Sequence, residues 1–288
     1  MKTAILIDSG CDVSDELART YHMKVMRLHI IYPEKDYIDG TDITAETVYQ
    51  RFPREIPITS TPSPQDVREM LDEIKSEGYT HVLAFCISSG LSGTFNSATQ
   101  ARAMLLEKYP DAQIYLVDTL AACAGEGQLV LDAIEKRDAG MPIDELAHWL
   151  TAHRLDYRMW FTVDKLDFLY HGGRVSRTSA ALGTMLNIKP VMDVDTAGKL
   201  RVVRKVRARK RSLIDLANET LKAIQENPQH RIIISTSGDF EAANFVKERL
   251  HEASPQTPLQ IGNIGPTIAS HTGFGCVAVF SMAASERK

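Results

Sequence analysis

The sequence predicts an α/β protein of two domains, the first a three-layer domain with a mainly parallel sheet and the second an α/β domain with a mixed sheet. Short apolar segments typical of buried strands alternate with longer segments of helical periodicity, which is the pattern of βαβ units. The 288 residues, 44% of them apolar, suffice for two cores of ordinary size. We expect the boundary near residue 156, with domains at 1–156 and 157–288.

The first half repeats an order of strand and helix. Apolar runs cover residues 3–8, 24–31, 81–87 and 113–118. The run 81–87 (HVLAFCI) has the continuous apolar character of a strand buried on both faces. Helices are expected at residues 14–21, 64–77, 94–108, 122–139 and 143–153. Ser63 should cap the second of these helices, because Pro64 fills the first helical position and Asp66 lies in the first turn.

The second half indicates a sheet that is not purely parallel. Residues 189–195 and 199–205 flank Thr196-Ala197-Gly198 and predict a β-hairpin. Further strands are expected at residues 158–163, 231–235 and 276–282, and helices at 180–187 and 240–251. Residues 265–272 are expected to form a turn-rich loop in which His271 could reach a ligand.

Composition excludes several classes of protein. The 37 acidic and 33 basic residues give a net charge of −4, which argues against sequence-wide attraction to nucleic acid or to anionic membranes and leaves room only for a transient membrane contact. No apolar run approaches the roughly 20 residues that span a bilayer. The four cysteines are widely spaced without a C-x-x-C pair, so neither a zinc site nor a disulfide framework is predicted. We expect a cytoplasmic protein without a metal or other cofactor.

The loop from Ser88 to Thr94 carries the clearest signal of a ligand. It joins the end of a buried strand to the start of a helix, where free N–H groups and the helix dipole favour an anion. Asp8-Ser9 and Asp118-Thr119 end neighbouring strands, so all three loops should converge on one edge of the sheet. Because the loop lacks a Walker lysine, the ligand should be a small anion; a serine that merely caps the helix is the simpler alternative.

A basic run suggests a docking face. Eight basic residues and no acidic one occupy the segment from Lys199 to Arg211. A solvated strand followed by a helix start is the ordinary interpretation, and a face for an acidic or phosphorylated partner is the sharper one. A nucleic-acid site also fits such a run, but no known nucleic-acid module surrounds it.

A serine hydrolase is the weakest hypothesis. Ser92, His271 and Asp8 supply the three residue types of a catalytic triad. Gly90-Leu91-Ser92-Gly93, however, departs from the G-x-S-x-G nucleophile elbow, because its closing glycine comes one residue early.

Taken together, seven short motifs resemble the DegV family over the full length of the chain. They are Ile7-Asp8-Ser9, residues 59–63 (TSTPS), residues 87–98 (ISSGLSGTFNSA), Asp118-Thr119, Gly172-Gly173-Arg174, residues 186–190 (LNIKP) and His271-Thr272-Gly273. The resemblance implies a protein that encloses one long-chain fatty acid, such as palmitate, stearate or oleate, between two α/β domains. It also implies a carrier without catalysis of its own, which presents the fatty acid to the catalytic subunit of an ATP-dependent fatty acid kinase for acyl-phosphate formation and phospholipid synthesis.

The resemblance also implies the site residues. Thr59 or its neighbours Ser60 and Thr61, together with Ser92, would hold the carboxylate, with His271 nearby. Thr61 stands where the family's TSQPS-type motif has Gln, which leaves open which hydroxyl points inward. Arg174 and Arg207 match basic positions that would face the kinase or the phosphate being transferred.

Two alternatives belong to other classes. A sugar-phosphate binding or isomerising enzyme could use the loop from Ser88 to Thr94 for its phosphate. A nucleic-acid binder could use the basic run, and its affinity would then fall steeply with salt.

Overall fold

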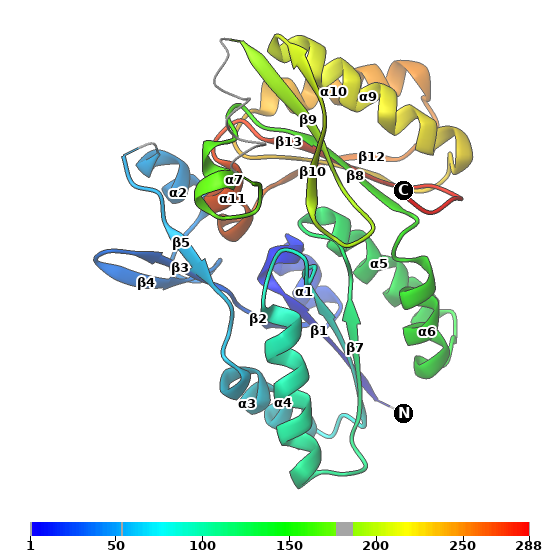
Figure 1. Cartoon of the computed structure of the whole chain (residues 1–288). Helices are drawn as coiled ribbons and strands as arrows, with labels where there is room; N and C mark the ends of the chain where they lie inside the picture. The colour runs from blue at the N-terminus through cyan, green and yellow to red at the C-terminus, as the bar shows by residue number, and fades with distance from the viewer. Residues whose placement is uncertain (1, 53, 177–186, 288) are drawn as a thin grey trace.

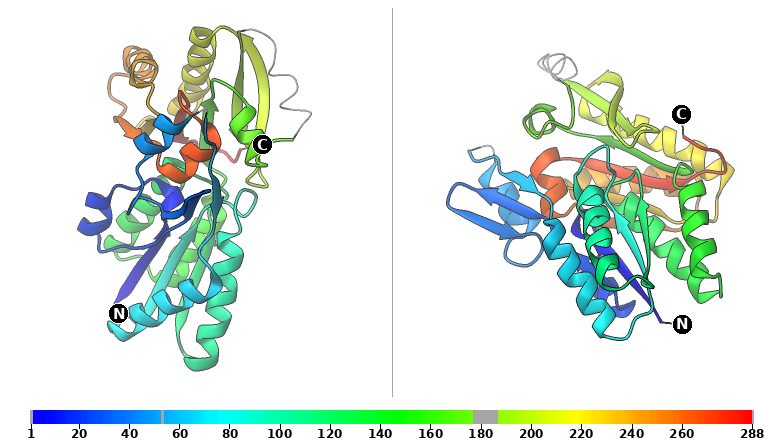
Figure 2. Two further views of the ribbon diagram at one scale, coloured as in Figure 1. Left: turned by 90° about the vertical axis from the view of Figure 1, so that its left-hand side faces the viewer. Right: turned by 60° about the horizontal axis from the view of Figure 1, so that its bottom comes forward.

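The computed structural model describes residues 2–52, 54–176 and 187–287. In the described part of the chain, no helix is both long and apolar enough to cross a membrane. The predicted α/β class is confirmed: a parallel sheet and a mixed sheet lie one above the other, each with helices against it (Figures 1 and 2).

The first sheet is parallel and lies between two layers of helices. In spatial order its strands are β2 (Lys24–Met26), β1 (Thr3–Asp8), β6 (His81–Cys86) and β7 (Gln113–Asp118). One face packs on α3 (Pro64–Ser76) and α4 (Thr94–Lys108), and the other on α5 (Ala124–Asp138) and α6 (Ile143–His153). Between β1 and β2 the chain forms a 3-10 turn, η1 (Ser9–Cys11), and α1 (Asp15–Thr20). This is the predicted three-layer arrangement.

Local sequence explains why these elements begin where they do. The Ser63 hydroxyl accepts from the Asp66 N–H at 3.2 Å and the Asp66 carboxylate accepts from the Ser63 N–H at 3.0 Å, which is the reciprocal capping expected at the start of α3. Pro64 occupies the first turn, where its missing N–H costs no hydrogen bond. The alternation of strands and helices over residues 81–153 is confirmed.

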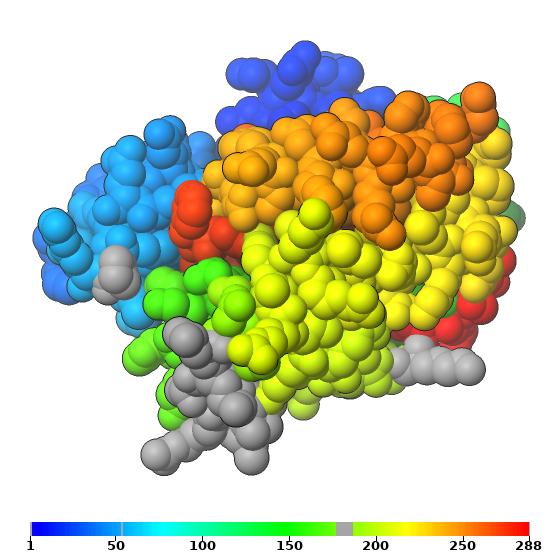
Figure 3. Space-filling model, turned by 90° about the horizontal axis from the view of Figure 1, so that it is seen from above, coloured from blue at the N-terminus to red at the C-terminus, as the bar shows by residue number. Residues whose placement is uncertain are grey.

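The second sheet is mixed and has six strands. In spatial order they are β10 (Leu200–Arg207), β9 (Ile188–Val194), β8 (Tyr157–Thr162), β13 (Val277–Met282), β11 (Ile232–Thr236) and β12 (Leu259–Asn263). Only β11 and β12 run parallel among these described neighbours, and the predicted hairpin joins β9 to β10. The helices α9 (Arg209–Glu226) and α10 (Phe240–Ala253) lie side by side over one face (Figure 3). The other face packs against α5 of the first half.

Because α5 lies between the two sheets, it is buried on nearly all sides (Figure 1). One hydrophobic cluster therefore includes Phe85 of the first sheet, Leu129 of α5 and Phe280 of the second sheet. The expected boundary near residue 156 falls between α6 and β8. That this boundary divides the chain into two domains stays a prediction.

A small third sheet was not predicted. The apolar run at residues 24–31 is interrupted at Leu28, whose N–H bonds to the Ser9 hydroxyl at 3.0 Å. Only β2 stays in the parallel sheet, while the next residues form β3 (His29–Tyr32) of an antiparallel sheet with β4 (Lys35–Ile38) and β5 (Ile58–Ser60). A second unpredicted element, α2 (Ala45–Arg51), follows β4.

The expectation of a loop at residues 265–272 is wrong. These residues form α11 (Pro266–Thr272), with Gly265 as N-cap and Pro266 in the first turn. α11 contacts α2, β3, β5 and also α7 (Asp167–His171), so the small sheet is attached to the C-terminal half. The helix expected at residues 180–187 falls almost entirely on residues 177–186, which lie outside the described part of the chain.

Candidate functional site

A cavity of about 100 Å³ lies between the two halves of the protein. Most of its lining is apolar and comes from the second sheet, the start of α5, α7 and α11; the apolar side chains include Ala122, Cys123, Met159, Phe161, Leu169, Val194, Leu200, Ile264, Ile268 and Phe280. Such a lining favours a ligand that is itself mainly apolar.

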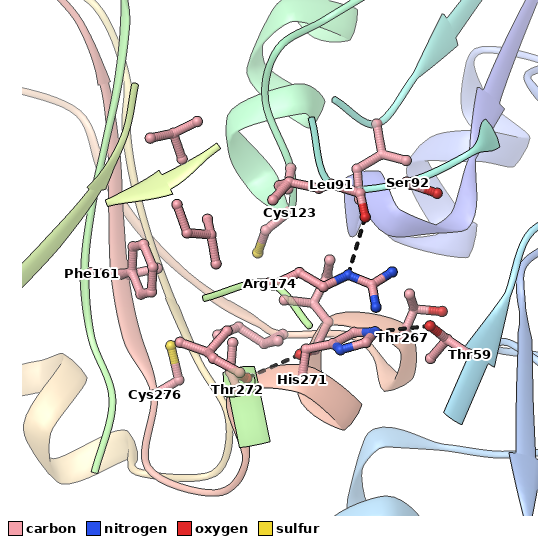
Figure 4. A pocket seen from close by; sticks show the side chains of 18 of the residues that line it. Thr59, Leu91, Ser92, Cys123, Phe161, Arg174, Thr267, His271, Thr272 and Cys276 are labelled. Atoms are coloured by element: carbon pink, nitrogen blue, oxygen red, sulfur yellow. Dashed lines mark hydrogen bonds between the residues drawn. The ribbon is translucent and has the colours of Figure 1, made fainter. Parts of the chain in front are cut away.

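Polar side chains gather at one end of this cavity (Figure 4). All five residues predicted to bind a carboxylate line it: Thr59, Ser60, Thr61, Ser92 and His271. The threonine and serine residues of 59–61 come from β5 and the residue after it, Ser92 precedes α4, and His271 lies in the last turn of α11. The fold thus brings together segments far apart in sequence, while their role as carboxylate ligands stays a prediction.

Within the loop from Ser88 to Thr94, only the Ser92 hydroxyl lines the cavity. The Ser88 hydroxyl donates to the Gly198 carbonyl at 2.8 Å, and the Ser89 hydroxyl donates to the Asp118 carboxylate at 2.6 Å. Ser92 Oγ lies 2.9 Å from Thr94 Oγ1 and accepts from the Thr94 N–H at 3.3 Å. The N-cap of α4 is Gly93, without a side-chain cap hydrogen bond, so Ser92 is a residue of the cavity that also bonds to the first residue of α4.

The predicted convergence of three loops on one sheet edge is confirmed. Asp8 accepts from the Ile87 N–H at 2.6 Å, and Asp118 accepts from the Ser89 N–H at 3.0 Å. The turn of the β9–β10 hairpin packs on the same loop, and a Cβ at Gly90 would lie 2.6 Å from the Ala197 carbonyl oxygen. A glycine at this position lets the second half close on the edge of the first.

His271 connects α11 to β5. Its Nε2 lies 2.8 Å from Thr59 Oγ1, across 212 residues of sequence. Burial, and secondarily the positive charge of Arg174, lowers the pKa of His271 to about 3. The imidazole is therefore neutral near pH 7 and contributes hydrogen bonds to the site without a net charge.

Arg174, expected to face the kinase or the phosphate being transferred, has a half-buried side chain that lines the cavity, and its role toward a partner stays a prediction. Its Nε donates to the Leu91 carbonyl at 3.1 Å, and its Nη1 donates to the Gly172 carbonyl. No ion pair to Arg174 is present among the described residues. Burial lowers its pKa from the usual value, yet a guanidinium stays charged at neutral pH. The polar end of the cavity thus carries a cation that forms no ion pair with any residue that the structure describes.

Four of the eight residues in the basic run pair with acidic neighbours. Arg201 pairs with Asp193, Arg204 with Asp215 and Glu219, Arg209 with Asp239, and Arg211 with Asp215. Arg207, by contrast, is exposed at the end of β10 and has no ion pair within the described ranges. Half of the run is therefore held by ion pairs, and Arg207 belongs to the half that still matches the predicted docking surface.

Neither a metal site nor a hydrolase triad is formed by the residues that the structure describes. No group of three or more His, Cys, Asp or Glu side chains among them could hold a metal ion. Ser92 bonds to Thr94, His271 bonds to Thr59, and Asp8 accepts from backbone N–H groups. The hydrogen-bond chain that a Ser-His-Asp nucleophile needs is therefore not present in this arrangement.

Two cavity residues were missed because α11 was expected as a loop. Thr267 and Thr272 lie on α11 and line the cavity, and Thr267 also donates to the Asp39 carboxylate at 2.6 Å. The signal for this helix is present in the sequence, since Gly265-Pro266 matches the N-cap and first position of a helix.

Comparison with known proteins agrees with the geometry. The family model described as "Uncharacterised protein, DegV family" matches residues 2–284. A DegV domain-containing protein of Clostridium perfringens is 38% identical over 97% of this chain and 97% of its own length.

Solved structures show the same fold. The structure of a fatty-acid-binding DegV family protein from Thermus thermophilus has a TM-score of 0.87, at 29% identity over 98% of this chain and 100% of that one. A fatty-acid-binding DegV family protein from Streptococcus agalactiae gives a TM-score of 0.87, at 31% identity over 99% of this chain and 100% of that one. The Streptococcus pneumoniae Fatty Acid Kinase (Fak) B3 protein loaded with linoleic acid has a TM-score of 0.86 at 23% identity over 98% of this chain and 100% of that one, a likeness of fold alone. This chain belongs to the DegV family.

Proposed function

We propose that this protein binds one long-chain fatty acid in the cavity between its two halves. The observation that best supports this proposal is a mainly apolar cavity with hydroxyl groups and the Arg174 guanidinium at one end. The acyl chain would lie among residues such as Met159, Phe161 and Phe280, and the carboxylate beside Thr59 and Ser92. The fatty-acid-binding relatives from Thermus and Streptococcus agalactiae support this proposal.

The two ends of the cavity would contribute differently to binding. The apolar end would supply most of the affinity, and the polar end would place the carboxylate. At about 0.8 kcal/mol for each buried CH₂, a sixteen-carbon chain gains roughly 11 kcal/mol before the costs of ordering it. The hydroxyls of Thr59 to Thr61 and Ser92 donate hydrogen bonds without neutralising the carboxylate. Arg174 adds a charge of the opposite sign at the same end. A sugar phosphate would instead require polar partners along most of the lining.

The finer part of the proposal concerns a partner. We infer a carrier without catalysis of its own, which presents the carboxylate to an ATP-dependent fatty acid kinase for acyl-phosphate formation. The resemblance to the family supports this role. Arg207 supports it physically, because an exposed cation without an ion pair can receive an acidic or phosphorylated group. Arg174, at the polar end of the cavity, would lie close to the carboxylate during transfer.

Replacing Ser92 tests the carboxylate end directly. Ser92→Ala should weaken fatty-acid binding by about 1 to 2 kcal/mol, the loss expected for one hydrogen bond, and leave the fold intact. Ser89→Ala is the matched control, since this exposed hydroxyl of the same loop points to Asp118. Displacement of a fluorescent fatty acid measures both variants, with sugar phosphates as competitors. Unchanged affinity in Ser92→Ala would remove Ser92 from the site.

A further inference from the structure

Gly172 faces one edge of the His271 imidazole. It ends α7 with φ −72° and ψ −6°, an ordinary helical conformation that any residue adopts. A Cβ at this position would overlap His271 Nδ1 and would lie 2.7 Å from Cε1. Glycine is thus required here because any side chain would collide with the imidazole, and not because of the backbone conformation.

The two ring nitrogens of His271 have different surroundings. Nε2 lies 2.8 Å from Thr59 Oγ1. Nδ1 is buried and has no hydrogen-bond partner among the described residues, because the Gly172 backbone covers it. A side chain at Gly172 would push the ring away from this position, and the Thr59 contact would be lost with it.

These surroundings select one tautomer. A neutral imidazole carries its proton on only one nitrogen. A proton on Nδ1 would be a buried donor without an acceptor, pressed against the backbone, which costs free energy. A proton on Nε2 is instead donated to the Thr59 hydroxyl oxygen. The geometry therefore favours the Nε2–H form.

The tautomer decides what Thr59 can offer to a ligand. When Nε2–H donates to Thr59 Oγ1, the hydroxyl keeps its own proton free to donate into the cavity. In the other tautomer the Thr59 proton would be consumed by Nε2, and only lone pairs would face the ligand. We propose that Gly172 is a positioning residue that holds His271 as the Nε2–H tautomer and so makes Thr59 a hydrogen-bond donor to the bound carboxylate. This inference rests on the proposed fatty-acid function.

The same turn also reaches the second hydroxyl of the site. The Gly172 carbonyl accepts from Arg174 Nη1, and Arg174 Nε donates to the carbonyl of Leu91, the residue before Ser92. The segment from Gly172 to Arg174 therefore contacts His271 on one side and the Ser92 loop on the other. One short turn places both groups that would hold the carboxylate.

Nitrogen-15 NMR of the His271 imidazole in the unmodified protein tests the tautomer without any variant at Gly172, with assignment by loss of the signal in His271→Ala. We expect the pattern of a neutral ring protonated at Nε2, unchanged between pH 5 and 8 because the pKa of His271 is about 3. A ring protonated at Nδ1, or one that titrates in this range, would overturn the proposal.

Gly172→Ala tests the positioning role. We expect fatty-acid affinity to fall roughly tenfold or more, as for one lost hydrogen bond to a charged group, together with a change in the His271 spectrum. Gly262→Ala is the matched control, because a Cβ there meets its nearest atoms at 3.6 and 3.9 Å, which is ordinary contact. This control should keep both affinity and spectrum.

A double-mutant cycle shows whether Gly172 acts through His271. In a His271→Ala background, Gly172→Ala should cause no further loss of affinity, since the ring that it displaces is absent. An equal tenfold loss in both backgrounds would contradict the proposal. Failure of the unmodified protein to bind fatty acids would overturn the proposed function instead, and the imidazole spectrum would still report the tautomer.

Discussion

The two ends of α5 contact the second half of the protein in opposite ways. Toward its C-terminus, buried Asp132 contacts Tyr157, His230 and Arg231, with His230 Nε2 at 2.9 Å from its carboxylate. Toward its N-terminus, α5 contacts the second sheet through Gly125, beside Met159 and Phe280 of the cavity. One end is a polar joint and the other borders an apolar cavity.

This difference indicates which part of the interface is fixed. Between the two ends, Gln128 donates to the carbonyls of Arg231 and Phe280, at 2.8 and 3.2 Å, so hydrogen bonds also hold this part of α5 against the second half. Beside Gly125 the close neighbours are the apolar side chains of Met159 and Phe280, whose contacts are less directional than hydrogen bonds. We expect ligand entry to widen the cavity end while the joint stays closed.

Breaking the joint should have the largest effect. Asp132→Asn removes one partner of a buried ion-pair network and should lower the free energy of unfolding by about 3 to 5 kcal/mol. Asp138→Asn, which loses only a partly exposed pair with Arg137 on the same helix, should cost less than about 1 kcal/mol. Denaturant unfolding compares the two variants. Equal losses in the free energy of unfolding would show that the Asp132 network does not hold the two halves together.

The two ends should also respond oppositely to pH. Burial raises the pKa of Asp132, but the hydrogen bond and charge of His230, with Arg231, bring it below its usual value. Its contribution to stability is therefore present above the unfolded pKa and lost as the pH falls through the folded pKa. Near the N-terminus of α5, burial raises the pKa of Asp12, which accepts from the Cys123 thiol at 2.7 Å, to about 8. Its contribution is present below the unfolded pKa and lost as the pH rises to the folded value.

Asp12→Asn tests this opposition. Between pH 5 and 8 the Asp12 carboxyl should stay protonated in the folded protein and ionise in the unfolded chain, which lowers the free energy of unfolding by up to about 1.4 kcal/mol per pH unit. The free energy of unfolding of Asp12→Asn should fall less over this range. The stability of the variant relative to the unmodified protein should therefore increase as the pH rises. Parallel pH profiles would show that folding does not raise the pKa of Asp12.

Filling the contact beside the cavity should have a smaller effect on stability and a selective effect on ligands. A Cβ in Gly125→Ala would lie 2.8 Å from Met159 Cγ and 2.9 Å from Phe280 Cδ1. Such overpacking costs about 1 to 3 kcal/mol and pushes both side chains toward the cavity. We expect affinity for the longest acyl chains to fall more than affinity for short ones, measured over a chain-length series. Equal losses at every length would contradict this.

The smallest effect on binding is expected at Arg207. Because this residue is exposed at the end of β10 and does not line the cavity, Arg207→Glu should leave stability and fatty-acid affinity unchanged. It should slow acyl-phosphate formation when a fatty acid kinase and ATP are supplied. Equal loss of binding and transfer would indicate a structural role instead.

The sequence predicted those parts of the fold that depend on local pattern. The strand at residues 81–87 and the cap formed by Ser63 are set by neighbours within a few residues, and both are confirmed. The third sheet depends on distant contacts such as that between Ser9 and Leu28, so the apolar run at 24–31 could not reveal it. Elements that depend on contacts between residues far apart in the sequence could not be predicted from local pattern.

The site followed the same rule. The loop around Ser92 was visible as a strand end that opens a helix, His271 was a candidate ligand from its loop residues, and the family resemblance added residues 59–61. The inward position of Arg174 was not predictable, because it depends on carbonyls of Gly172 and Leu91 in two separate segments. Gly172 likewise has an ordinary backbone conformation, so nothing local marks its contact with His271.

Native mass spectrometry of the freshly purified protein, followed by denaturing extraction of any released molecule, tests the central claim most directly. We expect a one-to-one adduct that releases a long-chain fatty acid, because so much buried apolar surface should make dissociation slow. If the protein carries no adduct and takes up no added palmitate, stearate or oleate, the fatty-acid function is contradicted, and the loop from Ser88 to Thr94 must serve another anion.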